Sequence, residues 1–186
     1  MQGSGGTGSL TLDGGSVSPG NSPGTMTAGA TTFGPGGSYT WEINSTTPGG
    51  AGASTGWDLL SISGALTITS TSGSPFTIHL TSLMANNSPG DVFNFNASQN
   101  SSYTIATASG GIGSFSANQF TLNTDSFSNA LHGGTWSLAA AGNDLNLNFT
   151  ASAIPEPSTY AAIAGVAALA LAAWRRRRIR ANALTV

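Results

Sequence analysis

The sequence predicts an all-β fold for residues 1–153, followed by one C-terminal helix. Three observations lead to this prediction: apolar and polar residues alternate in short runs, glycine and proline turn signals separate the runs, and a continuous apolar run near the C-terminus ends in arginines. Alternation with a period of two is typical of half-buried strands, and many short strands between turn signals indicate a β-sandwich or a β-solenoid. Periodicity alone leaves both architectures open.

The clearest strand signal is the run 39–43, in which Tyr39, Trp41 and Ile43 alternate with polar residues. The same pattern recurs at 60–68, 76–80 and 145–149. Turn signals stand between such runs, at 13–15, 22–24, 34–37, 48–50, 88–90, 110–111 and 133–134. The polar positions are dominated by Thr, Ser and Asn, which can stack in ladders along a solenoid without any charge.

The charges are few and unevenly placed. Only 6% of the residues are charged, against a norm of about 25%, while 39% are hydrophobic, so a core can form. Residues 1–154 contain six acidic residues and neither Lys nor Arg, whereas all five arginines follow Trp174. Nucleic-acid binding by residues 1–154 is therefore excluded, because phosphate neutralisation needs cations. The chain has no cysteine, so a disulfide framework or a thiolate metal site is not available.

The C-terminal region changes character at Ile154. Pro155 and Pro157 fix extended backbone and remove donors, so we expect a helix only after them, over residues 158–174. At about 1.5 Å per residue this helix is about 26 Å long. That length is the short end of what crosses a hydrocarbon core of about 30 Å. We therefore predict a minimal transmembrane helix over 158–174.

The residues at the two ends of this apolar run support a membrane topology. Tyr160 and Trp174 are the amphipathic aromatics that prefer the membrane interface. The run is followed by a basic cluster within 175–180: Arg175, Arg176, Arg177, Arg178 and Arg180. By the positive-inside rule, this cluster places the C-terminus in the cytoplasm and the large N-terminal region outside the inner membrane. An ordinary buried helix with a basic last turn is the alternative, but so many arginines exceed what a helix end needs.

The segment Pro155-Glu156-Pro157, the apolar helix and the terminal arginines together resemble the PEP-CTERM sorting signal of Gram-negative bacteria that make exopolysaccharide. The resemblance covers residues 154–180. It implies that a membrane-embedded exosortase recognises Pro155, Glu156 and Pro157, cleaves near them, and passes the protein to the cell surface or extracellular matrix. The first residues have neither the basic nor the apolar part of a signal peptide, so for an exported protein we expect that this chain lacks its true N-terminus.

A second resemblance concerns the region before the tail. The stretches 18–27, 39–43, 57–68 and 142–147 are similar to the last repeats of autotransporter-associated β-strand proteins. This resemblance implies that residues 1–153 are the C-terminal part of a right-handed parallel β-helix, with a β-sandwich as the alternative.

Catalytic chemistry is not expected. A lyase on a β-helix needs a cationic base, which residues 1–154 lack, and a glycosidase needs two carboxylates about 5–9 Å apart. The acids instead lie where turns or surface positions explain them: Asp13 and Asp91 beside turn glycines, Glu42 on a polar strand face, and Asp58 in a Trp-Asp pair. His79 and His132 are expected to be solvated. We predict no enzyme activity, no cofactor and no metal site.

The predicted function is that of an exported structural protein of the cell surface or extracellular matrix, with the membrane, an exosortase and exopolysaccharide as its candidate partners. The alternative is an adhesin or carbohydrate-binding protein on the same scaffold, with Trp57 or Trp136 as the sugar platform. An indole exposed in a groove lined by Thr and Asn would favour the binding protein.

Overall fold

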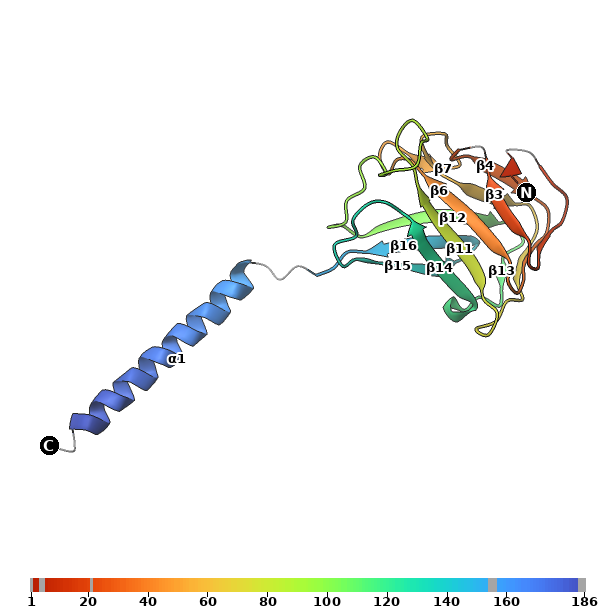
Figure 1. Cartoon of the computed structure of the whole chain (residues 1–186). Coiled ribbons are helices and arrows are strands. Elements are labelled where there is room, and N and C mark those ends of the chain that lie inside the picture. The colour runs from red at the N-terminus through yellow and green to blue at the C-terminus, as the bar shows by residue number, and fades with distance from the viewer. Residues whose placement is uncertain (1, 4–5, 21, 154–156, 184–186) are drawn as a thin grey trace. The chain divides into compact units, whose positions relative to one another are not determined.

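The computed structural model describes residues 2–3, 6–20, 22–153 and 157–183. The chain divides into two compact units, a β unit, Met1–Ser152, and a C-terminal unit, Ala153–Val186 (Figure 1). The β unit holds three sheets, and the C-terminal unit holds one helix. A mainly β fold with one C-terminal helix is therefore confirmed.

Each sheet collects strands that are far apart in the chain. The first sheet contains β2 (Leu10–Leu12), β5 (Thr31–Phe33), β10 (Leu66–Ile68) and β13 (Ile112–Gly113). The second contains β1 (Gln2–Gly3), β3 (Ser16–Pro19), β6 (Ser38–Ile43), β11 (Phe76–Ser82) and β14 (Phe120–Ser126), with the short strands β7 (Gly50–Ala51) and β8 (Gly56–Trp57) attached to β6. The third contains β4 (Thr25–Ala28), β9 (Leu59–Ile62), β12 (Ser101–Ala108), β16 (Asp144–Thr150) and β15 (Thr135–Ala141). A 3-10 helix, Ala117–Gln119, precedes β14.

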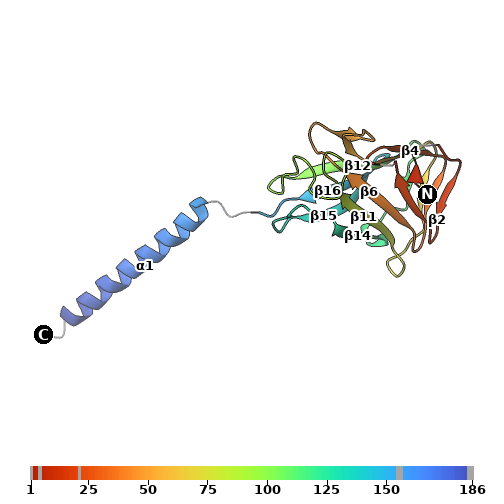
Figure 2. The same cartoon turned by 45° about the horizontal axis from the view of Figure 1, so that its top comes forward.

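The chain visits these sheets in rotation. It passes from β2 to β3 to β4, then from β5 to β6 to β9, then from β10 to β11 to β12. We call each such passage a layer. In these three layers each new strand pairs in parallel with the strand of the layer before. Figure 1 shows β3, β6 and β11 side by side, and Figure 2 brings β2 into view. Antiparallel sandwiches pair their strands differently, so this topology does not favour the sandwich alternative.

The core is built from the residues that the alternation placed on one face. Tyr39, Trp41 and Ile43 of β6 are fully buried, and the same holds for Phe76, Ile78 and Leu80 of the neighbouring β11. Burying a large apolar side chain stabilises a fold by about 1.5–3 kcal/mol. Aromatic stacking also joins successive layers, because the rings of Phe33 in β5 and Phe76 in β11 stack with their centroids 4.2 Å apart. The predicted strand runs at 39–43, 76–80 and 145–149 are thus confirmed as β6, β11 and β16.

The third sheet ends in a change of strand direction. β12 pairs in parallel with β9 on one side and antiparallel with β16 on the other. β15 and β16 form a hairpin whose turn is Gly142-Asn143. Gly142 has φ +62°, as the first central residue of a type II′ turn requires.

Helix α1 spans Pro157–Ala183. Pro157 occupies the first helical position, where its missing N–H costs nothing. The helix is longer than the predicted 158–174 and continues through the arginine cluster. Among the residues that the structure describes, no helix is long and apolar enough to cross a membrane. The transmembrane helix predicted over 158–174 is therefore not supported: alanine dominates the run and the arginines start directly after Trp174, whereas a span needs about 20 predominantly apolar residues.

Gly37 allows a test of the close packing between layers. A Cβ at this buried position would collide with the carbonyl oxygen of Leu12 and lie 2.8 Å from the Phe76 ring. Since overpacking typically costs about 1–3 kcal/mol, we expect Gly37→Ala to lower the free energy of unfolding by that amount in urea denaturation. The control is Gly8→Ala, where a Cβ meets nothing within 4 Å. Equal stability of the two variants would contradict the described packing.

Candidate functional site

The connections from the second to the third sheet form the most elaborate surface of the β unit. They run over residues 20–24, 44–58, 83–100 and 127–134 in successive layers. Main-chain hydrogen bonds join the second and third of them, from Thr46 N–H to the Phe93 carbonyl and from Phe93 N–H to the Asn44 carbonyl, both at 3.1 Å. The third and fourth are joined by Asn129, whose side chain accepts from Val92 N–H at 2.8 Å. Neighbouring connections are therefore fixed to one another.

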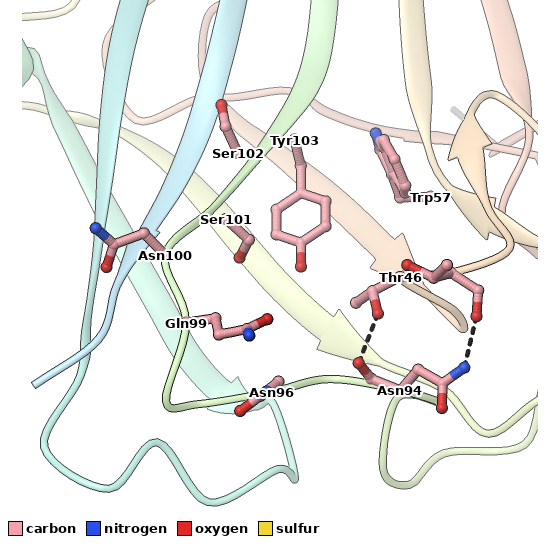
Figure 3. Close-up of a pocket in the computed structure, with 10 residues that line it drawn as sticks. Thr46, Trp57, Asn94, Asn96, Gln99, Asn100, Ser101, Ser102 and Tyr103 are labelled. Atoms are coloured by element: carbon pink, nitrogen blue, oxygen red, sulfur yellow. Dashed lines mark hydrogen bonds between the residues drawn. The ribbon is translucent and has the colours of Figure 1, made fainter.

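A hollow of about 230 Å³ lies between connections 44–58 and 83–100. We call it the groove (Figure 3). Its lining consists of two aromatic residues and a set of neutral polar residues: Thr46, Thr47, Trp57, Asn94, Asn96, Gln99, Asn100, Ser101, Ser102 and Tyr103. None of these side chains carries a charge at neutral pH. Tyr103 is buried and Trp57 is half-buried, so the groove offers one indole, hydroxyls and amides.

The two aromatic rings are held in place by their own contacts. The Trp57 indole N–H donates to the Thr104 carbonyl at 3.1 Å, and its ring meets Tyr103 edge to face, with centroids 5.1 Å apart. Tyr103 also packs on Trp41 in the core, and its hydroxyl points toward the connection that carries Asn96 and Gln99 in Figure 3. Burial raises the pKa of the Tyr103 phenol, and a hydrogen bond with the Ser101 side chain opposes this shift. The phenol is neutral at physiological pH.

The amide side chains around the groove have different roles. The Thr46 hydroxyl donates to the Asn94 carbonyl at 2.7 Å, and the Asn94 amide donates to the Thr47 carbonyl at 2.6 Å. These two bonds clamp the connections together. Asn96 and Asn100 use their side-chain oxygens to accept main-chain N–H groups, of Ser98 at 3.0 Å and Ala151 at 2.9 Å.

The remaining amide groups of the groove are open to a ligand. Within the described part of the chain, the side-chain nitrogens of Asn96 and Asn100 and the whole amide of Gln99 form no hydrogen bond. All three residues are exposed.

A second hollow, of about 470 Å³, continues the groove. It shares Asn100, Ser101 and Ser102 with the first and extends along β12, β15 and β16 to Ser137, Asn148 and Thr150. This lining is uncharged as well. A third hollow, of about 300 Å³, brings Asp91 and His132 together with Asn129. His132 is exposed, and His79 is half-buried. The structure shows no group of three or more metal-ligating side chains among the residues it describes.

Asp58 departs from the sequence-based expectation of a turn or surface residue, because it is fully buried. The carboxyl group accepts the N–H of Gly24 at 2.9 Å with one oxygen and that of Glu42 at 3.0 Å with the other. Its main-chain carbonyl accepts the Trp41 indole N–H at 3.1 Å. Burial raises the pKa of Asp58 to about 8. The two main-chain N–H donors lower this pKa, and the negative charge of Glu42 raises it. Asp58 is a buried link between layers.

The two tryptophans proposed as sugar platforms differ in their surroundings. Trp136 is enclosed by other aromatic rings, with Phe95, Phe127 and Phe149 each within 6.0 Å of its ring centroid, and it serves packing. Trp57 is half-buried and lies in a groove lined by Thr and Asn. The sequence singled out Trp57, but not the amides that line the groove with it, since these come from another connection.

The sorting, interface and basic residues predicted from the sequence all belong to the C-terminal unit. Pro155 and Glu156 lie outside the described residues, and Pro157 begins α1. Of the interface aromatics, Tyr160 lies in α1 and Trp174 is 53% exposed. Arg175 and Arg176 are exposed, and α1 continues through the rest of the cluster, Arg177, Arg178 and Arg180.

Comparison with known proteins confirms the C-terminal resemblance. The family model for the PEP-CTERM protein-sorting motif matches residues 153–178. This motif implies an exported protein that an exosortase processes and sorts to the cell surface. No curated protein and no solved structure matches the chain. The resemblance of the β unit to autotransporter-associated β-strand proteins has no support from these comparisons.

The raised pKa of Asp58 predicts how stability depends on pH. In the unfolded chain an Asp titrates near pH 4, so between about pH 4 and 8 the folded state holds a proton that the unfolded state has lost. The contribution of Asp58 to stability is then largest below about pH 4 and falls as the pH rises to 8. Burial also raises the pKa of Glu42, which adds a slope of the same sign.

We expect Asp58→Asn to flatten this slope and, since it leaves a main-chain N–H facing an amide N–H, to cost about 1–3 kcal/mol at low pH. The measurement is urea denaturation between pH 4.5 and 8.5. Asp13→Asn, at an exposed turn, is the matched control and should keep the wild-type slope. A wild-type slope in Asp58→Asn would show that Asp58 does not carry the pH dependence.

Proposed function

We propose that this chain is an exported structural protein of the cell surface or extracellular matrix, and that its β unit is the C-terminal part of a right-handed parallel β-helix. The observation that carries the proposal is the PEP-CTERM motif at residues 153–178, directly after the β unit. A sorting signal in this place delivers the β unit to the outside of the cell, so its role is carried out there.

The β-helix is supported by the rotation of the chain through three sheets with parallel returns. Thr11, Thr32 and Thr67 occupy one register position in three layers and form the kind of polar ladder that a solenoid stacks. Parallel crossover connections are right-handed in nearly all proteins, which supports the proposed hand.

A structural rather than enzymatic role is supported by how the acidic residues are used. Both oxygens of Asp58 are occupied by main-chain donors, and Asp125 is exposed and bonds to its near neighbour Asn123. Residues 1–154 offer no Lys or Arg as a catalytic base or as a contact for nucleic acid. We therefore propose no catalytic activity and no nucleic-acid partner.

For the C-terminal unit we propose that an exosortase recognises Pro155, Glu156 and Pro157. The arginines of 175–180 would contact anionic lipid headgroups at the membrane surface, an attraction of about 1 kcal/mol per basic residue. Tyr160 and Trp174 are the residues of α1 suited to the interface next to them.

Sorting can be tested by the intact mass of the surface-exposed protein in hosts with and without an exosortase. We expect the wild-type protein to lose the mass of the tail only where the exosortase is present. Glu156→Ala should keep the tail, because it removes the acidic residue of the motif, and Ser152→Ala, outside the matched residues, should be processed like the wild type. Retention of the full tail by wild-type protein in the exosortase host would contradict the proposal.

A further inference from the structure

We propose that the groove binds an uncharged polysaccharide, with Trp57 packing against a sugar ring and the amides of Asn96, Gln99 and Asn100 binding its hydroxyls. The inference rests on the proposed export of the protein, which places the groove among extracellular glycans. It assigns a ligand class to a site made by the connections 44–58 and 83–100.

The aromatic side of the groove suits the apolar face of a sugar. A pyranose ring presents C–H groups on its faces and hydroxyls around its edge, so it packs on an aromatic surface while the hydroxyls stay free to bond. Trp57 cannot turn away easily, because its N–H bond to the Thr104 carbonyl and its edge contact with Tyr103 hold the indole. A preformed surface of this kind lowers the entropy cost of binding.

The amide side of the groove suits the hydroxyls. A side-chain amide offers both donors and acceptors, and a hydroxyl can use either. The side-chain oxygens of Asn96 and Asn100 already accept main-chain N–H groups, which fixes both side chains and leaves their nitrogens as donors for a ligand. Gln99 adds an acceptor, and the clamp between Asn94 and residues 46–47 keeps this connection beside Trp57.

Charge and shape narrow the ligand class. The lining is neutral, and residues 1–154 carry six acids without any Lys or Arg, so polyuronates and other anionic glycans would be repelled. The second hollow shares Asn100, Ser101 and Ser102 with the groove and continues over β15 and β16. A continuous open surface fits several units of a chain better than one isolated sugar.

The test uses the purified full-length chain in affinity gel electrophoresis. The gels contain one of four neutral polysaccharides (dextran, soluble starch, hydroxyethyl cellulose or mannan) or the anionic polygalacturonate. We expect retardation by at least one neutral polysaccharide and none by polygalacturonate. The double variant Asn96→Ala/Gln99→Ala should bind that polysaccharide about tenfold more weakly, the loss expected for two or more hydrogen bonds.

The matched control is Asn118→Ala, an exposed amide in the 3-10 helix outside the groove, which should bind like the wild type. Urea denaturation checks that each variant is folded, and Gln99→Ala alone serves if the double variant is not. The proposal is overturned by folded protein that none of the four neutral polysaccharides retards, by retardation with polygalacturonate alone, or by undiminished binding in the groove variants. Processing by the exosortase is measured separately, so a failure of sorting and a failure of binding give different results.

Discussion

The hydrogen bonds of the buried Asp58 carboxyl group are the interactions on which both the packing of the layers and the groove depend. Residues 1–154 contain no Lys or Arg, and the partners that compensate for the burial of this group come from the main chain, Gly24 N–H and Glu42 N–H. A buried polar group without such partners would cost several kcal/mol. These bonds join the connection after β3 to β6, and they fix the position of the next residue toward the N-terminus, Trp57. The position of Trp57 in the groove is thus set by a buried carboxyl group that no ligand would touch.

Alternation predicted the strands well because the inward residues of each layer are large and apolar. β6, β11 and β16 lie where the runs around Tyr39, Phe76 and Leu145 indicated them. Which strands pair with one another could not be predicted in this way. Partners such as Ile78 and Tyr39 are separated by a whole layer of chain, and no local pattern encodes their register. Asp58 was misjudged for the same reason, because an acid beside a tryptophan gives no sign of the N–H groups that surround it in space.

The candidate site was only half visible in the sequence. Trp57 could be named as an aromatic in a Thr- and Asn-rich chain, yet Asn96, Gln99 and Asn100 come from a connection about one layer later and meet it only through the parallel stacking of β6 and β11. At the C-terminus the opposite holds, because a sorting signal is read by its order along the chain. That segment could be recognised without any knowledge of the β unit, although no described helix is long and apolar enough for the membrane span expected there.

The reversal of direction in the β15–β16 hairpin affects how molecules could associate end to end. A parallel ladder can be continued only by a strand running the same way with the slanted bonds of that arrangement. In the third sheet β16 is antiparallel to β12 and β15 is antiparallel to β16, so the two reversals cancel and the outermost strand, β15, runs in the same direction as β12. Among the described strands beyond β10, β11 and β12, the first sheet adds only β13 and the second only β14, whereas the third adds both β16 and β15. A second molecule stacked on this end would therefore meet an edge of matching direction but a step of one strand in the third sheet. Such a step opposes fibre growth by simple continuation of the layers, because flat and level edges are the ones that invite pairing with another chain.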